Sequence, residues 1–357
     1  MDSKKTYKIL TILLIMQWAF LRIIAQFPAE IEKYYSHGLY IYISKFLNIL
    51  FGWIPFSIGD ILYALLVIVI IKNIFTAIKN KKIHFKNTLF KIGGYLSILF
   101  FIFHLNWGLN YFRQPVYKTL NFENEKYTPN ELVDFTEKLI VKINKVQLSI
   151  TKNDTIIVKN ELNKPEIQEI SYQVYKQFQQ NYPQYHHENL KVKHSLFSLP
   201  LTYMGFAGYL NPLTNEAQVN YLIPKNTYPM IVCHELAHQV GIASESEANF
   251  IGYLATTNSN DVYFKYSGYL MAVRFCLFEI FLKDPERFEL IKLELNKGIL
   301  KDIRQSEAFW ESYQNWTEKY FKTFYDTFLK ANKQKDGMKS YNKVVALLIN
   351  YHKNKEL

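Results

Sequence analysis

Sulfur and conformationally permissive residues are scarce in this sequence. Its two cysteines, Cys233 and Cys276, are too few for a disulfide framework or a four-cysteine metal site. Only 13 Gly and 11 Pro occur among 357 residues, which excludes collagen-like and low-complexity chains. Apolar and aromatic residues are abundant instead: 49% of the chain is hydrophobic, including 27 Tyr and 27 Phe. The chain therefore has enough apolar material for one large or two modest folding units.

The charge balance is basic, at +11, but Lys and Arg are spread along the whole chain. No nucleic-acid-binding motif accompanies them, so we expect no nucleic-acid partner. The lipid bilayer is the expected partner, because an anionic membrane surface accounts better for a dispersed positive charge.

Three long apolar runs crowd into the first third of the chain, at about residues 9–25, 57–76 and 90–109. A helix that spans a bilayer needs about 20 mostly apolar residues, and a soluble core rarely supplies three such runs so close together. The first run is also too long for a cleaved signal peptide and lacks a small-residue cleavage pattern. The sequence predicts a membrane domain over residues 1–112 with three transmembrane helices.

The loops flanking these runs predict their orientation. Basic residues gather before the first run and between the second and third: Lys4, Lys5, Lys8, Lys79, Lys81, Lys82 and Lys86. The segment 27–56 has only Lys33 and Lys45, balanced by Glu30 and Glu32, and is rich in Tyr and Trp. The positive-inside rule places the amino terminus inside, and the aromatic residues predict an interfacial segment over 27–56 on the outer side.

Residues 113–357 read as a soluble, mainly helical α+β domain outside the membrane. Thr128-Pro129-Asn130-Glu131 and Pro165 predict the starts of two helices, and Asp284-Pro285 predicts a third. Short alternating stretches predict strands at Thr155 to Val158, at Leu190 to Phe197 and at Ala217 to Pro224. From Thr227 to about Ile349 the pattern is helical, with a break at Gly337.

One cluster carries recognisable chemistry. His234, Glu235 and His238 form H-E-x-x-H in a segment with helical apolar spacing. Two histidines four residues apart share one helix face and can bind the same Zn²⁺. Glu235 follows the first histidine, where it can accept a proton from a metal-bound water as the catalytic general base.

A third ligand is needed for a catalytic zinc site with three protein ligands. Gly241 can end the helix in a left-handed conformation, and Ser244 to Glu247 fit a capping box that starts another helix. We favour Glu245 as the metal ligand, and Glu247 is the alternative. Asn249 lies one turn after Glu245 and could orient it.

HELAH followed by ESEAN resembles the zincin metallopeptidases of the glutamate-ligand branch, the gluzincins. It is similar to the H-E-x-x-H and E-x-x-A-[ND] pairing of the CAAX-prenyl proteases, the membrane heat-shock proteases and the phage-repressor-cleaving peptidases. The resemblance implies a zincin-like fold and a Zn²⁺ cofactor. It also implies that His234, His238 and Glu245 are the metal ligands, that Glu235 is the general base and that Asn249 orients a ligand. The chain as a whole is also similar to a bacterial membrane family known as a domain of unknown function.

A peptidase also needs a surface for its substrate and a donor for the developing oxyanion. Gly205 to Pro224 reads as a hairpin whose second strand is either an exposed edge that pairs with a peptide or an ordinary strand. The aromatic residues of 312–330 recur at helical spacing and are expected in the core, and Cys233 is expected to be a packed thiol. The candidates for the oxyanion donor are Tyr266, Tyr269, Arg274 and Tyr341.

These features together predict a zinc-dependent peptidase of the bacterial cytoplasmic membrane that hydrolyses peptides or proteins of the envelope. Two alternatives remain at this stage. The protein could be a metal-dependent cell-wall amidase, or it could be a non-catalytic assembly or sensing protein with a structural metal. Glu235 separates the last alternative from the others, because a structural metal site needs no base.

Overall fold

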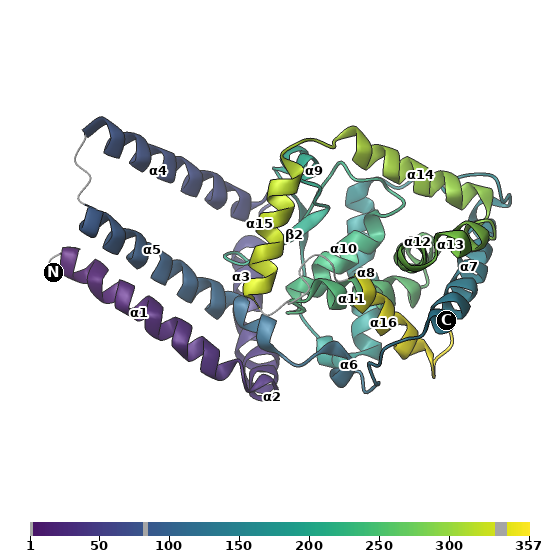
Figure 1. Ribbon diagram of the computed structural model, residues 1–357, viewed down its shortest axis with the longest axis horizontal. Coiled ribbons are helices and arrows are strands. Elements are labelled where there is room, and N and C mark those ends of the chain that lie inside the picture. Colours follow the sequence, from purple (N-terminus) through teal and green to yellow (C-terminus); the bar gives the residue numbers. More distant parts are fainter. Residues whose placement is uncertain (1–2, 81–84, 333–340) are drawn as a thin grey trace. The chain divides into compact units, whose positions relative to one another are not determined.

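The computed structural model describes residues 3–80, 85–332 and 341–357, and these are mostly helical with one small sheet (Figure 1). The chain divides into two compact units. The first unit contains Met1–Gln114 together with Asn211–Glu216, and the second contains Pro115–Leu210 together with Ala217–Leu357.

Three helices of the first unit are long and apolar enough to cross a membrane: α1 (Ser3–Ile24), α4 (Ile58–Asn80) and α5 (Phe85–Asn106). This confirms the three apolar spans expected from the sequence. Helix α1 packs along α5. Gly93 allows the two helices to approach closely, because a Cβ atom there would lie 2.6 Å from the Thr11 hydroxyl oxygen.

The segment between the first two apolar helices is also helical. It contains α2 (Pro28–Glu30), a π-helical stretch η1 (Ile31–Leu39) and α3 (Tyr40–Phe51), and a 3₁₀ turn η2 (Gly108–Phe112) follows α5. Arg113 fixes this segment with two hydrogen bonds to Glu32, from Nε to Oε2 at 2.8 Å and from Nη2 to Oε1 at 2.5 Å. The pair is nearly buried, and its bidentate, charge-assisted hydrogen bonds are stronger than those between neutral groups. The predicted interfacial position of the segment stays a prediction.

Asn211–Glu216, a short hairpin tip, is held within the first unit by buried polar groups. The Glu216 carboxylate accepts the backbone N–H groups of Ile58 (3.2 Å) and Gly59 (2.6 Å) at the start of α4. A negative charge at a helix amino terminus is favourable. Asn215 accepts a hydrogen bond from the Ser44 hydroxyl and donates one to Tyr40 Oη. All these polar groups are therefore satisfied, although water cannot reach them.

The second unit is built from helices around the central helix α10 (Tyr228–Gln239), which is buried nearly all round and packs against α8, α11 and α12. Its other helices and short helical turns are α6 (Val116–Thr119), α7 (Pro129–Thr151), α8 (Lys164–Asn181), η3 (Pro183–Tyr185), α9 (Ser198–Met204), α11 (Glu245–Thr257), α12 (Val262–Lys283), α13 (Pro285–Lys292), α14 (Lys297–Ser312), α15 (Glu318–Ala331) and α16 (Tyr341–His352).

Helix starts follow the capping signals in the sequence. Thr128 and Glu131 form the expected reciprocal capping box ahead of α7. The Asp284 side chain accepts the backbone N–H of Arg287 and so caps α13. The predicted break at Gly337 lies outside the described residues.

The sheet has three short strands, β1 (Val192–His194), β2 (Gly208–Asn211) and β3 (Glu216–Val219), in the order β1-β3-β2. Strand β1 runs parallel to β3, with Lys193 opposite Gln218. The strand preceding α10 was one candidate for an exposed edge, and that reading is wrong. Strand β3 is central and buried because it lies between β1 and β2, which are the two edge strands.

The strand expected at Thr155 to Val158 is also wrong, because this stretch has no regular structure. The alternating pattern of side chains predicted a strand, but the backbone of this stretch pairs with a side chain and not with another strand. The Val158 N–H donates to the Asp302 carboxylate at 3.1 Å, and the Tyr266 hydroxyl donates to the same oxygen at 2.6 Å. Burial raises the pKa of Asp302.

Asp302→Ala tests this buried contact. The substitution leaves the Val158 N–H and the Tyr266 hydroxyl unpaired, so we expect the free energy of unfolding to fall by about 2–3 kcal/mol. Asp134→Ala, on an exposed face of α7, is the control and should change it by less than about 0.5 kcal/mol. Chemical denaturation of both variants measures the difference, and equal values would show that Asp302 does not hold the segment.

Candidate metal centre

Helix α10 presents its two histidines on one face, one turn apart. The His234 and His238 ring centroids are 4.6 Å apart and the rings are nearly perpendicular, at 88°. Both side chains are almost completely buried. The spacing of four residues brings them together, and the core around α10 fixes their positions.

The chain reverses at Gly241, as its sequence position predicted. Gly241 has a φ of +87°, the left-handed conformation that favours glycine. The N–H of Ile242 bonds to the carbonyl of Ala237 (3.0 Å) and that of Gly241 to the carbonyl of His238 (2.9 Å), the pattern of a Schellman motif. This turn returns the chain to the two histidines within a few residues.

Helix α11 then begins at Glu245, and its carboxylate meets both imidazoles. His234 Nε2 lies 3.4 Å from Glu245 Oε2, and His238 Nε2 lies 3.5 Å from Glu245 Oε1. Two ligands bound tetrahedrally to zinc at the usual bond lengths are roughly 3.3 Å apart. The described part of the chain contains one such set of potential metal ligands, and all its ligand atoms lie within 4.8 Å of one another. The separations therefore suit a single metal ion.

The ring orientation of His238 also suits this role. Its Nδ1 lies 2.6 Å from the carbonyl oxygen of Ile242. A carbonyl oxygen can only accept a hydrogen bond, so Nδ1 carries the proton. Nε2, the nitrogen that can bind a metal, faces Glu245. The Schellman turn thus supplies both the chain reversal and the carbonyl that fixes the tautomer of His238.

Glu235 lies beside these three residues and is 2% exposed. Burial raises the pKa of its carboxyl to about 7. Its Oε2 has no hydrogen-bond partner among the described residues. A buried carboxylate oxygen without a donor is costly, and a water molecule in the site could supply that donor.

Gly208 in β2 lets Glu235 approach the strand. A Cβ atom at Gly208 would lie 2.4 Å from Glu235 Oε1 and 2.6 Å from the backbone oxygen of Gln218. No side chain fits between these atoms. Sequence reasoning placed Gly208 in a hairpin but did not connect it with the base, because the contact joins residues 27 positions apart.

The electrostatics of the cluster favour bound positive charge. Burial lowers the pKa of His238, but the Glu245 charge and hydrogen bond outweigh it and raise the pKa to about 9. Burial likewise raises the pKa of Glu245, but the two imidazoles outweigh it and hold that pKa well below the usual range. Two carboxylates and two imidazoles in so small a volume are a donor set that can hold a divalent cation.

The alternative ligand Glu247 and the predicted orienting residue Asn249 are not part of the three-ligand cluster. Glu247 Oε1 accepts the backbone N–H of Val116 at 2.9 Å, so this carboxylate fixes the segment before α7. The predicted capping box is wrong: the Ser244 side chain makes no capping hydrogen bond and pairs with the Ser246 hydroxyl instead. Asn249 is half-buried and its side chain makes no hydrogen bond within the described parts of the chain, so its orienting role stays a prediction.

Tyr325 is a site residue that sequence reasoning missed. Its hydroxyl donates to Glu245 Oε1 at 2.7 Å from helix α15. The expectation that the aromatic residues of 312–330 are core is wrong for four of the seven, because Trp316, Tyr320, Phe321 and Phe324 are exposed. Their helical spacing indicated a shared face but not what covers that face. A lone tyrosine in an aromatic helix gave no signal of its role.

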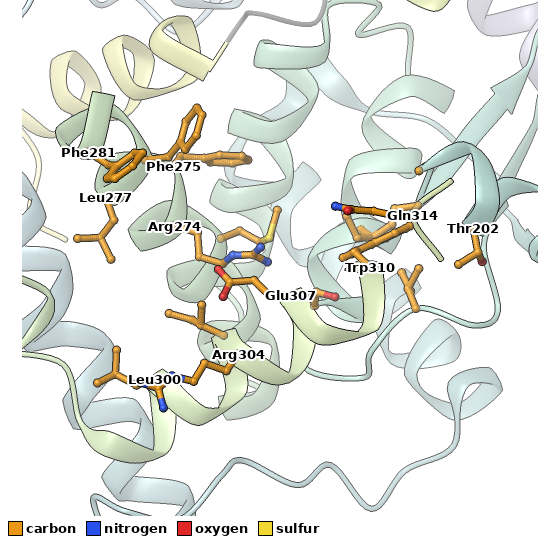
Figure 2. Close-up of a pocket in the computed structure, with 18 of the residues that line it drawn as sticks. Thr202, Arg274, Phe275, Leu277, Phe281, Leu300, Arg304, Glu307, Trp310 and Gln314 are labelled. Atoms are coloured by element: carbon orange, nitrogen blue, oxygen red, sulfur yellow. The ribbon is translucent and has the colours of Figure 1, made fainter. Parts of the chain in front are cut away.

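Two of the predicted oxyanion donors have partners outside the cluster. Tyr266 donates to Asp302, and Tyr269 is buried with its ring against Tyr253. The side chain of Tyr341, a further candidate, lies outside what the structure describes. Arg274 lines a cavity of about 700 Å³ between α12 and α14, shown in Figure 2. This cavity reaches Ile231, one helical turn before His234.

Cys233 is a packed thiol, as expected. It is fully buried and unpaired with another cysteine, and burial raises its pKa well above the ordinary value. A thiol in that state is neither a nucleophile nor a metal ligand.

Comparison with known proteins identifies a family without assigning an activity. The family model described as Protein of unknown function (DUF3810) matches residues 35–349. No curated protein and no solved structure matches the chain. The matched range contains α4, α5 and all of His234, Glu235, His238 and Glu245. Since it covers most of the sequence, the chain belongs to the DUF3810 family.

Proposed function

We propose that the protein is a membrane-anchored zinc peptidase of the bacterial cytoplasmic membrane that hydrolyses envelope proteins or peptides. The observation that carries this proposal is the convergence of His234, His238 and Glu245 beside the buried carboxyl of Glu235. Two histidines and one glutamate are a ligand set of catalytic zinc sites, and they leave a coordination position for water or substrate. A purely structural site would have no use for Glu235.

Glu235 acts in this proposal as the proton acceptor and donor. Its pKa of about 7 lets it take a proton from water and later pass that proton to the departing amine. Zinc, when bound, supplies a Lewis acid that polarises the scissile carbonyl and makes water more acidic. Tyr325 lies within hydrogen-bonding distance of the ligand Glu245 and is therefore placed to donate a hydrogen bond to the developing oxyanion.

Two features near the cluster support an extended peptide as the substrate. Strand β2 is the sheet edge next to Glu235, and edge strands bind peptides through backbone hydrogen bonds. The cavity between α12 and α14 begins one helical turn from His234 and is large enough for an apolar side chain of a substrate. In this proposal the amino terminus lies inside the cell and the second unit lies outside, as the positive-inside rule predicts.

Metal analysis and hydrolysis test the proposal together. The purified full chain should hold about one zinc per molecule, and so should Glu235→Gln, because Glu235 is not a ligand. Cleavage of a peptide library should fall by roughly 10²- to 10⁴-fold in Glu235→Gln. Elemental analysis by mass spectrometry and the initial cleavage rates measure the two quantities.

His238→Ala and the exposed His186→Ala form the matched control pair for metal binding. Zinc should raise the melting temperature of the native chain and of His186→Ala but not that of His238→Ala, because a ligand for the folded state stabilises it. A native chain without zinc, or equal cleavage by native and Glu235→Gln, would overturn the peptidase proposal.

Gly208→Ala tests the positioning of the base. The added methyl group would clash with the Glu235 carboxylate and with the Gln218 backbone oxygen and so would move the base, and we expect zinc content to stay the same while kcat falls by about 10²-fold. Gly38→Ala is the control, since its Cβ atom would meet only the Lys33 oxygen at 3.3 Å. An unchanged kcat in Gly208→Ala would show that the strand does not hold the base in place.

A reporter enzyme fused after Leu357 tests the orientation. A phosphatase that folds only outside the cytoplasm should be active at that position and inactive when fused before Met1. The opposite pattern would place the metal cluster in the cytoplasm and exclude envelope substrates.

A further inference from the structure

Helix α15 and the residues just before it expose a row of aromatic side chains. Trp316, Tyr320 and Phe324 follow one another at intervals of four residues and are 76%, 59% and 74% exposed. At this spacing they lie on one side of the helix. Such a concentrated apolar surface indicates an interaction site.

Helix α9 and the residues before it add to this surface. Leu196, Leu199 and Tyr203 are 54%, 51% and 47% exposed. Helix α9 packs against α15, and Asn315 donates a hydrogen bond to the Tyr203 carbonyl at 2.7 Å. We call the six side chains together the α9–α15 patch: Leu196, Leu199, Tyr203, Trp316, Tyr320 and Phe324.

Lysines accompany the aromatic side chains. Helix α15 carries Lys319, Lys322 and Lys330. Lys322 pairs with Glu318 and Lys330 pairs with Asp326, so Lys319 supplies the net positive charge of the helix. The Lys319 ammonium lies 5.0 Å above the Tyr320 ring. A protein–protein interface tends to exclude lysine from its apolar centre, whereas lysine beside Trp and Tyr is typical of membrane interfaces.

We propose that the α9–α15 patch docks on the headgroup region of the bilayer that anchors this chain, with a preference for anionic lipid. Tryptophan and tyrosine rings are favourable at that depth, and the net positive charge at Lys319 complements lipid phosphate. The three apolar helices of the first unit tether the second unit to a bilayer. A tether raises the effective concentration of the membrane, so even a small patch suffices for binding.

The other side of α15 reaches the metal centre. Tyr325 contacts Glu245 there, and Leu329 is fully buried. Docking would therefore fix one face of α15, and the opposite face of the same helix positions the Tyr325 hydroxyl at Glu245. This consequence rests on the proposed function, whereas the docking itself does not.

A fluorescent reporter on the patch tests the docking in the full chain. Leu199→Cys carries an environment-sensitive label, and Leu293→Cys, 77% exposed just after α13, is the matched control. In Figure 1, α13 and α15 lie well apart within the second unit. The native cysteines are both buried and so do not compete for the label. Both proteins are placed in nanodiscs that hold one chain each and contain either phosphatidylglycerol or phosphatidylcholine alone.

Spin-labelled lipids should quench the label at position 199, and iodide in solution should quench it several-fold less than the label at 293. The protection should be greater in phosphatidylglycerol and should weaken with salt. Trp316→Ser, Tyr320→Ser and Phe324→Ser together should remove the protection at 199. Because these side chains are exposed, the melting temperature of the triple variant should hardly change. The dependence of the protection on lipid and on salt tests the docking without these serine substitutions.

Equal iodide quenching at 199 and 293, or protection that the triple serine variant leaves intact, would overturn the docking. Protection that arises only in discs with two chains would assign the patch to a second copy and overturn it as well. These measurements involve neither metal nor hydrolysis. Failure of the docking is therefore distinguishable from failure of the peptidase proposal.

Discussion

The site depends on one constraint: a helix must end and the chain must return within a few residues. Gly241 satisfies it by adopting a left-handed conformation that a residue with a side chain rarely adopts. The turn delivers Glu245 to His234 and His238, and its Ile242 carbonyl fixes the His238 tautomer. Without this reversal the two imidazoles would share a helix face but would have no carboxylate partner.

Burial gives the cluster its chemical character. Helix α10 lies in the middle of the second unit, so its polar side chains are removed from water and must find partners within the protein. Glu245 and the imidazoles partly satisfy one another, as the opposite pKa shifts of His238 and Glu245 indicate. Glu235 remains incompletely paired, and strand β2 approaches it so closely that only Gly208 fits. Unsatisfied polar atoms at a buried cluster are typical of places where a protein binds something.

Strand β2 and helix α15 reach this cluster from different parts of the chain. The edge strand contributes the Gly208 contact to Glu235, and α15 contributes the Tyr325 hydroxyl. Each of these elements also has a part away from the cluster. The segment after β2 contains Asn215 and Glu216, whose side chains are hydrogen-bonded within the first unit, and α15 exposes its aromatic row to solvent. The cluster is therefore completed by groups that lie outside the central helix.

The sequence by itself determined the three apolar helices, the capped starts of α7 and α13, the left-handed Gly241 and the mostly helical second unit. These features depend on local spacing and on single residues, which a sequence displays directly. Tertiary structure alone decided that β3 is central, that Val158 pairs with Asp302, that Glu247 bonds to Val116 and that Tyr325 reaches Glu245. Each of these contacts joins segments far apart in the chain, and no local pattern specifies which distant group a backbone edge or a side chain will meet.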